Sequence, residues 1–156
     1  MSDNFQDVAL DTLQPQSDPA SNAQAPQVTT APIDASPQGL MMAAVRAAID
    51  RKGSNVVALH VAEVSFITDY FVIVTGFSRV QVRAIAQTIE GVNEEKIGRV
   101  PLRTEGMSDG SWVLLDYGEL IVHVLLPEER EFYNLEAFWG HADRVEIPAE
   151  FFETSR

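Results

Sequence analysis

The stretch SWVLLDYGELIVHVLL, residues 111–126, is the most strand-like part of the sequence, yet an acid, a tyrosine, a glycine and a second acid interrupt it at residues 116–119. Gly118 can adopt a positive φ without steric cost, so the interruption predicts the turn of a β-hairpin. By alternation along the first strand, Trp112 shares a face with Asp116. Because an aspartate lies on that face, it is not expected to be deep core at the turn end.

Apolar periodicity and capping residues predict the elements around the hairpin. Ser36 followed by Pro37 is typical of a helix start, and Ser78 with Gln81 forms an S-x-x-Q capping pattern. The run at 70–76 is apolar throughout, as expected for a central strand buried on both faces. The predicted elements are a helix at 37–52, strands at 55–61 and 70–76, a helix at 78–96, a short strand at 101–106, the hairpin, and a helix at 128–140. This order predicts a single α/β domain with a mixed β-sheet flanked by helices.

The first 37 residues differ in composition from the rest of the chain. They hold five of the eight prolines and five aspartates, with no lysine or arginine. Such a segment buries too little apolar area to offset its ordering entropy, so residues 1–37 are predicted to be a disordered acidic tail rich in Pro, Ala and Ser, and residues 38–156 the folded domain. It lacks the charge pattern of a signal or transit peptide. With no cysteine and no apolar stretch long enough for a membrane span, the expected location is the cytoplasm.

The charge of the chain limits its partners. The formal net charge is −12, and residues 116–156 carry ten acids against three arginines. An acidic surface repels phosphate backbones and attracts basic proteins. Direct, specific nucleic-acid binding is therefore not expected, although acids that merely keep the protein in solution would give the same count.

No catalytic or metal site is predicted. The motif TGFS at 75–78 could hold a phosphate at a helix start, but phosphoryl transfer also needs paired carboxylates for Mg²⁺, and none follow it. The three histidines have no ligand spacing, and no serine lies in a G-x-S-x-G elbow. His123 is expected to bond a neighbouring polar group, and Asp69 to accept backbone N–H groups in a turn. A nucleotidyltransferase-type enzyme using TGFS with Asp69 or Glu105 is the weaker alternative, and no cofactor is expected.

The aromatic residues near the hairpin admit two interpretations. Trp and Tyr are favoured anchors of protein interfaces, and Trp112 and Tyr117 would serve so if partly exposed. Equally, Trp112 would be core if it packs under a helix. Trp139 lies on the apolar face of the helix predicted at 128–140, together with Phe132 and Leu135, and is expected to be core.

Four segments resemble one known family. They are TDYFVIVTGFSRVQVRAIAQTIE (68–90), EG (105–106), WVLLDYGELIVHV (112–124) and REFYNLEAFW (130–139), and together they look like the ribosomal silencing factor (Iojap, RsfS) family from about residue 40 to 142. The resemblance implies a compact α/β domain, similar in shape to nucleotidyltransferases but lacking their catalytic acids.

The resemblance also implies a function. Members of this family bind large-subunit ribosomal protein fourteen, a basic protein, and sterically block subunit joining, which represses translation when nutrients are short. Relatives in organelles are linked to large-subunit assembly, the alternative role, and members are often homodimers. The partner-binding residues that match the family motifs are Asp69, Glu105, Gly106, Trp112, Asp116, Tyr117, Gly118 and Glu119. After Trp139 this chain has His141 where the family more often has aspartate.

Overall fold

The predicted hairpin forms between strands β6 (Trp112–Asp116) and β7 (Leu120–Leu125). At the turn Gly118 has a φ of +95°, and its N–H donates to the Asp116 carboxylate at 2.8 Å. The Tyr117 N–H donates to the Leu120 carbonyl at 2.8 Å and closes the loop. Asp116 and Gly118 therefore interrupt the apolar stretch because the backbone has to reverse there.

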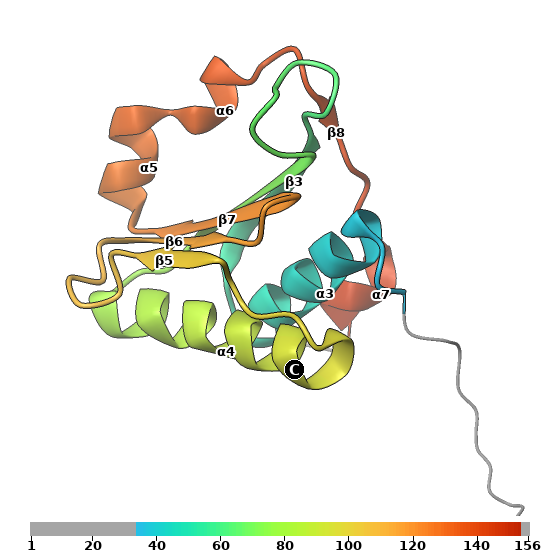
Figure 1. Ribbon diagram of the computed structural model, residues 1–156. Helices are drawn as coiled ribbons and strands as arrows, with labels where there is room; N and C mark the ends of the chain where they lie inside the picture. The colour runs from blue at the N-terminus through green and yellow to red at the C-terminus, as the bar shows by residue number, and fades with distance from the viewer. Residues whose placement is uncertain (1–33, 154–156) are drawn as a thin grey trace, which may run out of the picture. The chain divides into compact units, whose positions relative to one another are not determined.

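The computed structural model describes residues 34–153, and most of the predicted tail, residues 1–33, lies outside the described residues, as do 154–156. Besides the hairpin, the elements are α3 (Pro37–Asp50), β3 (Ser54–His60), β4 (Tyr70–Thr75), α4 (Arg79–Ile97), β5 (Arg103–Glu105), α5 (Pro127–Tyr133), α6 (Leu135–Phe138), β8 (Asp143–Arg144) and α7 (Ala149–Glu153) (Figure 1). Among the described helices, none has the length and apolar content that crossing a bilayer requires.

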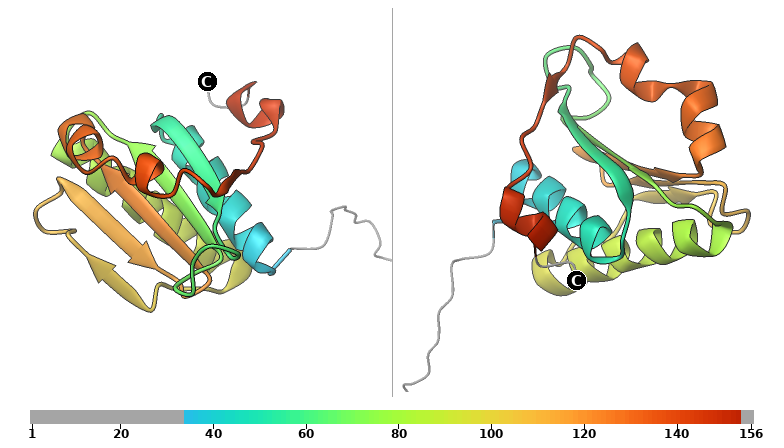
Figure 2. Two further views of the ribbon diagram at one scale, coloured as in Figure 1. Left: turned by 90° about the horizontal axis from the view of Figure 1, so that it is seen from above. Right: turned by 180° about the vertical axis from the view of Figure 1, so that it is seen from behind.

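The six strands form one mixed sheet, as predicted. Their order is β5-β6-β7-β4-β3-β8, and only the central pair β7–β4 is parallel. All six residues of β7 are buried, and so are five of the six in β4, as expected for strands covered on both faces. The sheet is strongly twisted: in the right-hand view of Figure 2, β3 runs steeply across the direction of β6 and β7.

Two long helices cover one face of the sheet. The predicted caps are present: Ser36 accepts from the Gly39 N–H at the start of α3, and Ser78 from the Gln81 N–H at the start of α4. α4 ends at Gly98, whose φ is +78°. The apolar sides of α3 and α4 and the inner residues of β4, β6 and β7 form the main core, which lies below the sheet in Figure 1.

The opposite face of the sheet has a smaller core and a thinner cover. Val57, Leu59, Phe71, Ile73 and Ile121 belong to this second cluster, against which Leu135 and Trp139 pack. The cover consists of α5 and α6, in which every residue stays at least partly exposed.

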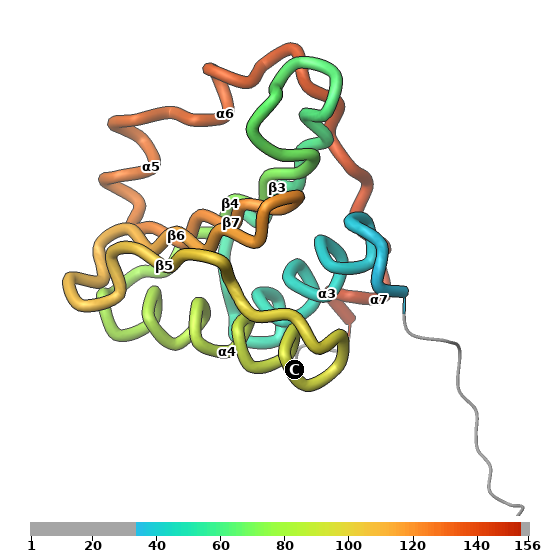
Figure 3. The backbone as a smooth tube through the Cα atoms, viewed as in Figure 1, coloured from blue at the N-terminus to red at the C-terminus, as the bar shows by residue number. Residues whose placement is uncertain are grey.

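The C-terminal part differs from the helix predicted at 128–140. Asn134 takes a left-handed conformation, with φ +49°, and divides the segment into α5 and α6. The two helices point in different directions, so Phe132 does not share a face with Leu135 and is 79% exposed. β8 and α7 have no counterpart in the prediction. Figure 3 shows the loop 61–69 beside the segment that follows α6, where Val64 lines one pocket with Phe138, Trp139 and His141.

Tyr117 follows the buried of the two interpretations that the sequence left open. Its side chain is fully buried in the main core instead of being partly exposed. The position that follows Asp116 on the hairpin points toward α4, so the ring packs inward. The Asn93 side chain lies beside the hydroxyl, but within the described residues neither side chain forms a hydrogen bond of standard geometry. Burial raises the pKa of Tyr117 to about 12.

We expect Tyr117→Phe to leave the free energy of unfolding unchanged or to raise it by up to about 1 kcal/mol, because it removes a buried hydroxyl that lacks a partner. Tyr117→Ala should lower it by about 3 to 5 kcal/mol through the cavity that it creates. Urea denaturation of both variants tests this. A loss above about 2 kcal/mol in the phenylalanine variant would contradict an unpaired hydroxyl.

Candidate functional site

A pocket of about 400 Å³ opens at the outer edge of the thinly covered face. It is lined by Glu105 and Gly106 at the end of β5 and by Trp112 and Leu114 of β6. Glu105 is paired with Leu114 in the β5–β6 ladder, so these two residues lie side by side. Gly106 has a φ of +86°, and a Cβ there would collide with the Trp112 carbonyl. The structure thus gathers three of the residues that the sequence singled out.

Trp112 is half-buried, with its ring held from two sides. The indole Nε1–H donates to Nδ1 of His123 at 3.1 Å, and the ring centroid lies 4.7 Å from that of Tyr133 in α5. Trp112 also lines the pocket. Trp112 therefore lies neither under a helix as core nor free in solvent, and its orientation is set before any partner arrives.

His123 is the buried hydrogen-bond acceptor that orients Trp112. It lies on β7 next to Leu114 in the ladder, and it is 7% exposed. Burial lowers the pKa of His123 to about 4. The neutral ring accepts a hydrogen bond from the indole N–H at Nδ1, which confirms the expectation that this histidine bonds a neighbouring polar group.

Arg103 shields the acids beside the pocket. Its guanidinium lies 3.2 Å from the Glu105 carboxylate and 3.4 Å from that of Asp116. The register places Arg103 opposite Asp116 and on the same sheet face as Glu105. The three side chains carry a net charge of −1, so the acids are partly neutralised in the free protein. Arg103 was missed from the sequence, because only the ladder brings it to Asp116.

Glu119 and Asp69 lie at the turn end of the hairpin. Arg99 donates two hydrogen bonds to the Glu119 carboxylate, at 2.7 and 3.0 Å, and these bonds lower the pKa of Glu119. The Glu119 carbonyl accepts from the N–H groups of Asp69 and Tyr70. The carboxylate is thus engaged by Arg99 within the chain. That Glu119 faces a basic partner, as the sequence suggests, stays a prediction.

The eight sequence-predicted residues therefore fall into separate groups. Trp112 and Asp116 are about 13 Å apart along the strand, and Glu105, Gly106 and Trp112 meet at the pocket. Asp69, Gly118 and Glu119 gather at the turn, while Tyr117 is buried.

The residues of the weaker, enzymatic alternative are not brought together. Asp69 precedes β4 and the TGFS motif follows it, so the two are about 20 Å apart along the strand. Glu105 lies on the edge strand β5, which is separated from β4 and the TGFS motif by the strands β6 and β7. Within residues 34–153, no group of three or more His, Asp or Glu side chains is arranged to hold a metal ion.

Comparison with known proteins points to one family. A family model described as "Ribosomal silencing factor during starvation" matches residues 34–156. The ribosomal silencing factor RsfS of Halalkalibacterium halodurans is 44% identical over 110 residues, covering 70% of this chain and 93% of that protein. The chloroplast protein Iojap of Arabidopsis thaliana is 37% identical over 123 residues, covering 78% of this chain and 51% of that protein.

A solved structure and a more distant relative extend the comparison. The crystal structure of a Chromobacterium violaceum protein superimposes with a TM-score of 0.64 at 31% identity, covering 72% of this chain and 92% of that one. A mouse protein named for mitochondrial assembly of the ribosomal large subunit is 35% identical over 74 residues, 46% of this chain and 32% of that protein.

The buried His123 predicts a pH dependence of stability. Its pKa is about 4 in the folded protein against an ordinary 6.5, so the unfolded chain binds more protons between these values. The free energy of unfolding should have its full value above pH 6.5 and should fall by up to about 3 kcal/mol as the pH drops toward 4. Urea denaturation across this range measures it. His123→Gln keeps an acceptor for Trp112 but does not titrate, so an equal slope above pH 5 in this variant would contradict the assignment.

Proposed function

This chain belongs to the ribosomal silencing factor (RsfS, Iojap) family, and from this membership we propose that it binds the large ribosomal subunit through ribosomal protein fourteen. Occupying that protein's surface would sterically prevent the small subunit from joining, and translation would be repressed. The cytoplasm is the compartment in which this would happen. The mechanism is obstruction, so it needs no reaction, metal or cofactor from this chain.

The observation that carries the proposal is the held tryptophan at an open pocket. The Trp112 ring is fixed by His123 and Tyr133, and it lines the pocket together with Leu114. A bulky ring that is already in place loses little conformational entropy when a partner covers it. The docking surface proposed here consists of Glu105, Gly106, Trp112, Leu114 and Asp116.

The charges at this surface support a basic partner. Glu105 is exposed and Asp116 half-buried, and among residues 34–153 only Arg103 forms ion pairs with these two acids. A lysine or arginine of the partner would compete with Arg103 for these carboxylates. Because Arg103 and Glu105 are well exposed, their contribution acts mainly on the rate of association and its salt dependence.

Large-subunit assembly is the second candidate, favoured by the name of the mouse relative. It would use the same surface, so variants of Trp112 affect both roles. Depletion of the protein from cells separates the two roles. Accumulation of precursor subunits would support assembly. Normal maturation of subunits, together with failure of the cells to survive starvation, would support silencing.

We expect Trp112→Ala to lower the affinity for large ribosomal subunits by at least about thirtyfold, the equivalent of about 2 kcal/mol for an anchor at the centre of an interface. Co-sedimentation in a sucrose gradient measures the loss. Trp112→Phe keeps an aromatic ring against Tyr133 but loses the bond to His123, so it should bind with intermediate affinity.

Phe77→Ala is the matched control, because Phe77 is 65% exposed and lies at the junction of β4 and α4. It should bind as well as the unmodified chain. Circular dichroism verifies that each variant is folded. Full binding by a folded Trp112→Ala variant would refute the proposed surface.

We expect Arg103→Gln to raise the association rate with large subunits by roughly three- to tenfold at low salt, because it uncovers Glu105 and Asp116 for a basic partner. The difference should vanish at high salt. Arg79→Gln removes the same charge from α4, where Arg79 pairs with Asp109. Stopped-flow rates that rise equally in both variants would mean that only the overall charge matters.

A further inference from the structure

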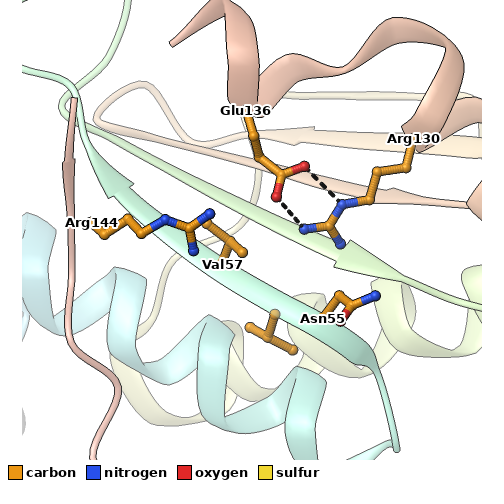
Figure 4. A pocket seen from close by; sticks show the side chains of 6 residues that line it. Asn55, Val57, Arg130, Glu136 and Arg144 are labelled. Carbon is orange, nitrogen blue, oxygen red and sulfur yellow. Dashed lines mark hydrogen bonds and ion pairs between the residues drawn. The ribbon is translucent and has the colours of Figure 1, made fainter. Parts of the chain in front are cut away.

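A second pocket, of about 380 Å³, lies on the same side of the sheet but at its other end. Figure 4 shows it between the start of β3, the helices α5 and α6, and β8. Its lining residues are Asn55, Val56, Val57, Arg130, Glu136 and Arg144. The docking surface lies over β5 and β6, so the two sites are separated by β7 and β4.

The guanidinium group of Arg130 is fixed in position by hydrogen bonds within the chain. Its side chain is 11% exposed, and it donates to both oxygens of Glu136, at 3.0 and 2.9 Å, and to the Thr75 hydroxyl at 2.9 Å. Arginine has five N–H groups, and these bonds engage three of them. Two donors therefore remain on a rigid, largely desolvated cation, which is an arrangement suited to binding an oxyanion.

Arg144 provides a second cation from a different element. In Figure 4 its guanidinium extends from β8 into the pocket, on the side opposite Arg130. Within the described part of the chain it forms no ion pair. It is near enough to Glu136 to assist Arg130, whose hydrogen bonds are the main cause, in lowering the pKa of Glu136. Glu136 is thus shared by two arginines and neutralises only one.

The pocket is consequently positive in a negative protein. Its two arginines and one glutamate sum to +1, whereas the whole chain carries −12. Asn55 adds an amide at the rim: it has a φ of +50° and lies at the irregularity between Ser54 and Val57 where the β3–β4 register shifts. Val56 and Val57 are the apolar lining residues.

We propose that this pocket binds a small phosphate-type anion, either inorganic phosphate or the phosphate group of a monoester. Donors approach from α5, β8 and β3, and a tetrahedral group with three or four oxygens can accept from all three directions, whereas a carboxylate offers two coplanar oxygens. Glu136 can accept from a hydroxyl of the ligand or from a protonated phosphate oxygen. The inference goes beyond the proposed function, and it requires neither a ribosome nor Trp112.

Titration of the ¹⁵N-labelled full chain with inorganic phosphate, at constant ionic strength, tests the site by NMR. We expect saturable shifts from a single site, concentrated at residues 55–57, 130–136 and 144, and at least tenfold weaker binding of acetate. Arg144→Gln should weaken phosphate binding at least tenfold. Glu136→Gln should strengthen it several-fold, because it removes the competing negative charge while its carbonyl can still accept from Arg130.

Arg79→Gln is the matched control: it removes the same charge from α4, across the sheet, and should change the dissociation constant less than twofold. Arg144 is exposed, so its replacement leaves the core intact, and the dispersion of the spectra verifies the fold. Shifts that rise linearly without saturation, or that appear at arginines throughout the surface, would overturn the proposal. An equal effect of Arg144→Gln and Arg79→Gln would do the same. Because no ribosome is present, these outcomes are independent of the docking experiments.

Discussion

The parallel pairing of β4 with β7 is the constraint on which the rest of the structure depends. Six residue pairs, from Tyr70–Leu120 to Thr75–Leu125, join the two strands at the centre of the sheet. Parallel neighbours require a long crossover, here α4 with β5 and β6. The crossover places α4 beside α3 on one face, where the larger core forms. The other face is left to whatever follows β7, namely two short helices divided at Asn134.

The incomplete cover explains where the binding surfaces lie. α5 and α6 lie over the apolar cluster formed by β3, β4 and β7, and a pocket lies on either side of them. One pocket is lined by Trp112 over β5 and β6, and the other lies over β3 and β8. α5 contributes to both, since Tyr133 contacts Trp112 and Arg130, one turn earlier, lines the second pocket. A helix with no fully buried residue is positioned mainly by such contacts.

Charge distinguishes the two pockets. At the docking surface a single arginine offsets two acids, and at the second pocket a single glutamate is shared by two arginines. The strongly negative total therefore agrees in sign with the docking surface but not with the second pocket. A negative total charge suits a protein whose proposed partner is basic. Against this background, the local excess of positive charge at the second pocket, where Thr75 and Glu136 fix Arg130, is a specific feature of the molecule.

The sequence by itself determined the hairpin, the capped helices α3 and α4, the buried strand β4 and the family. These depend on local periodicity, on turn chemistry such as that of Gly118, and on motifs read along the chain. Only the tertiary structure decided that Tyr117 points inward while Trp112 stays half-buried, since successive strand residues face opposite sides and the packing of the helices chooses which side is core. The same holds for the salt bridges of Arg103 and Arg99 and for the approach of Arg144 to the second pocket. These contacts are set by strand register and by the approach of distant segments, neither of which is encoded in the spacing of the residues that form them.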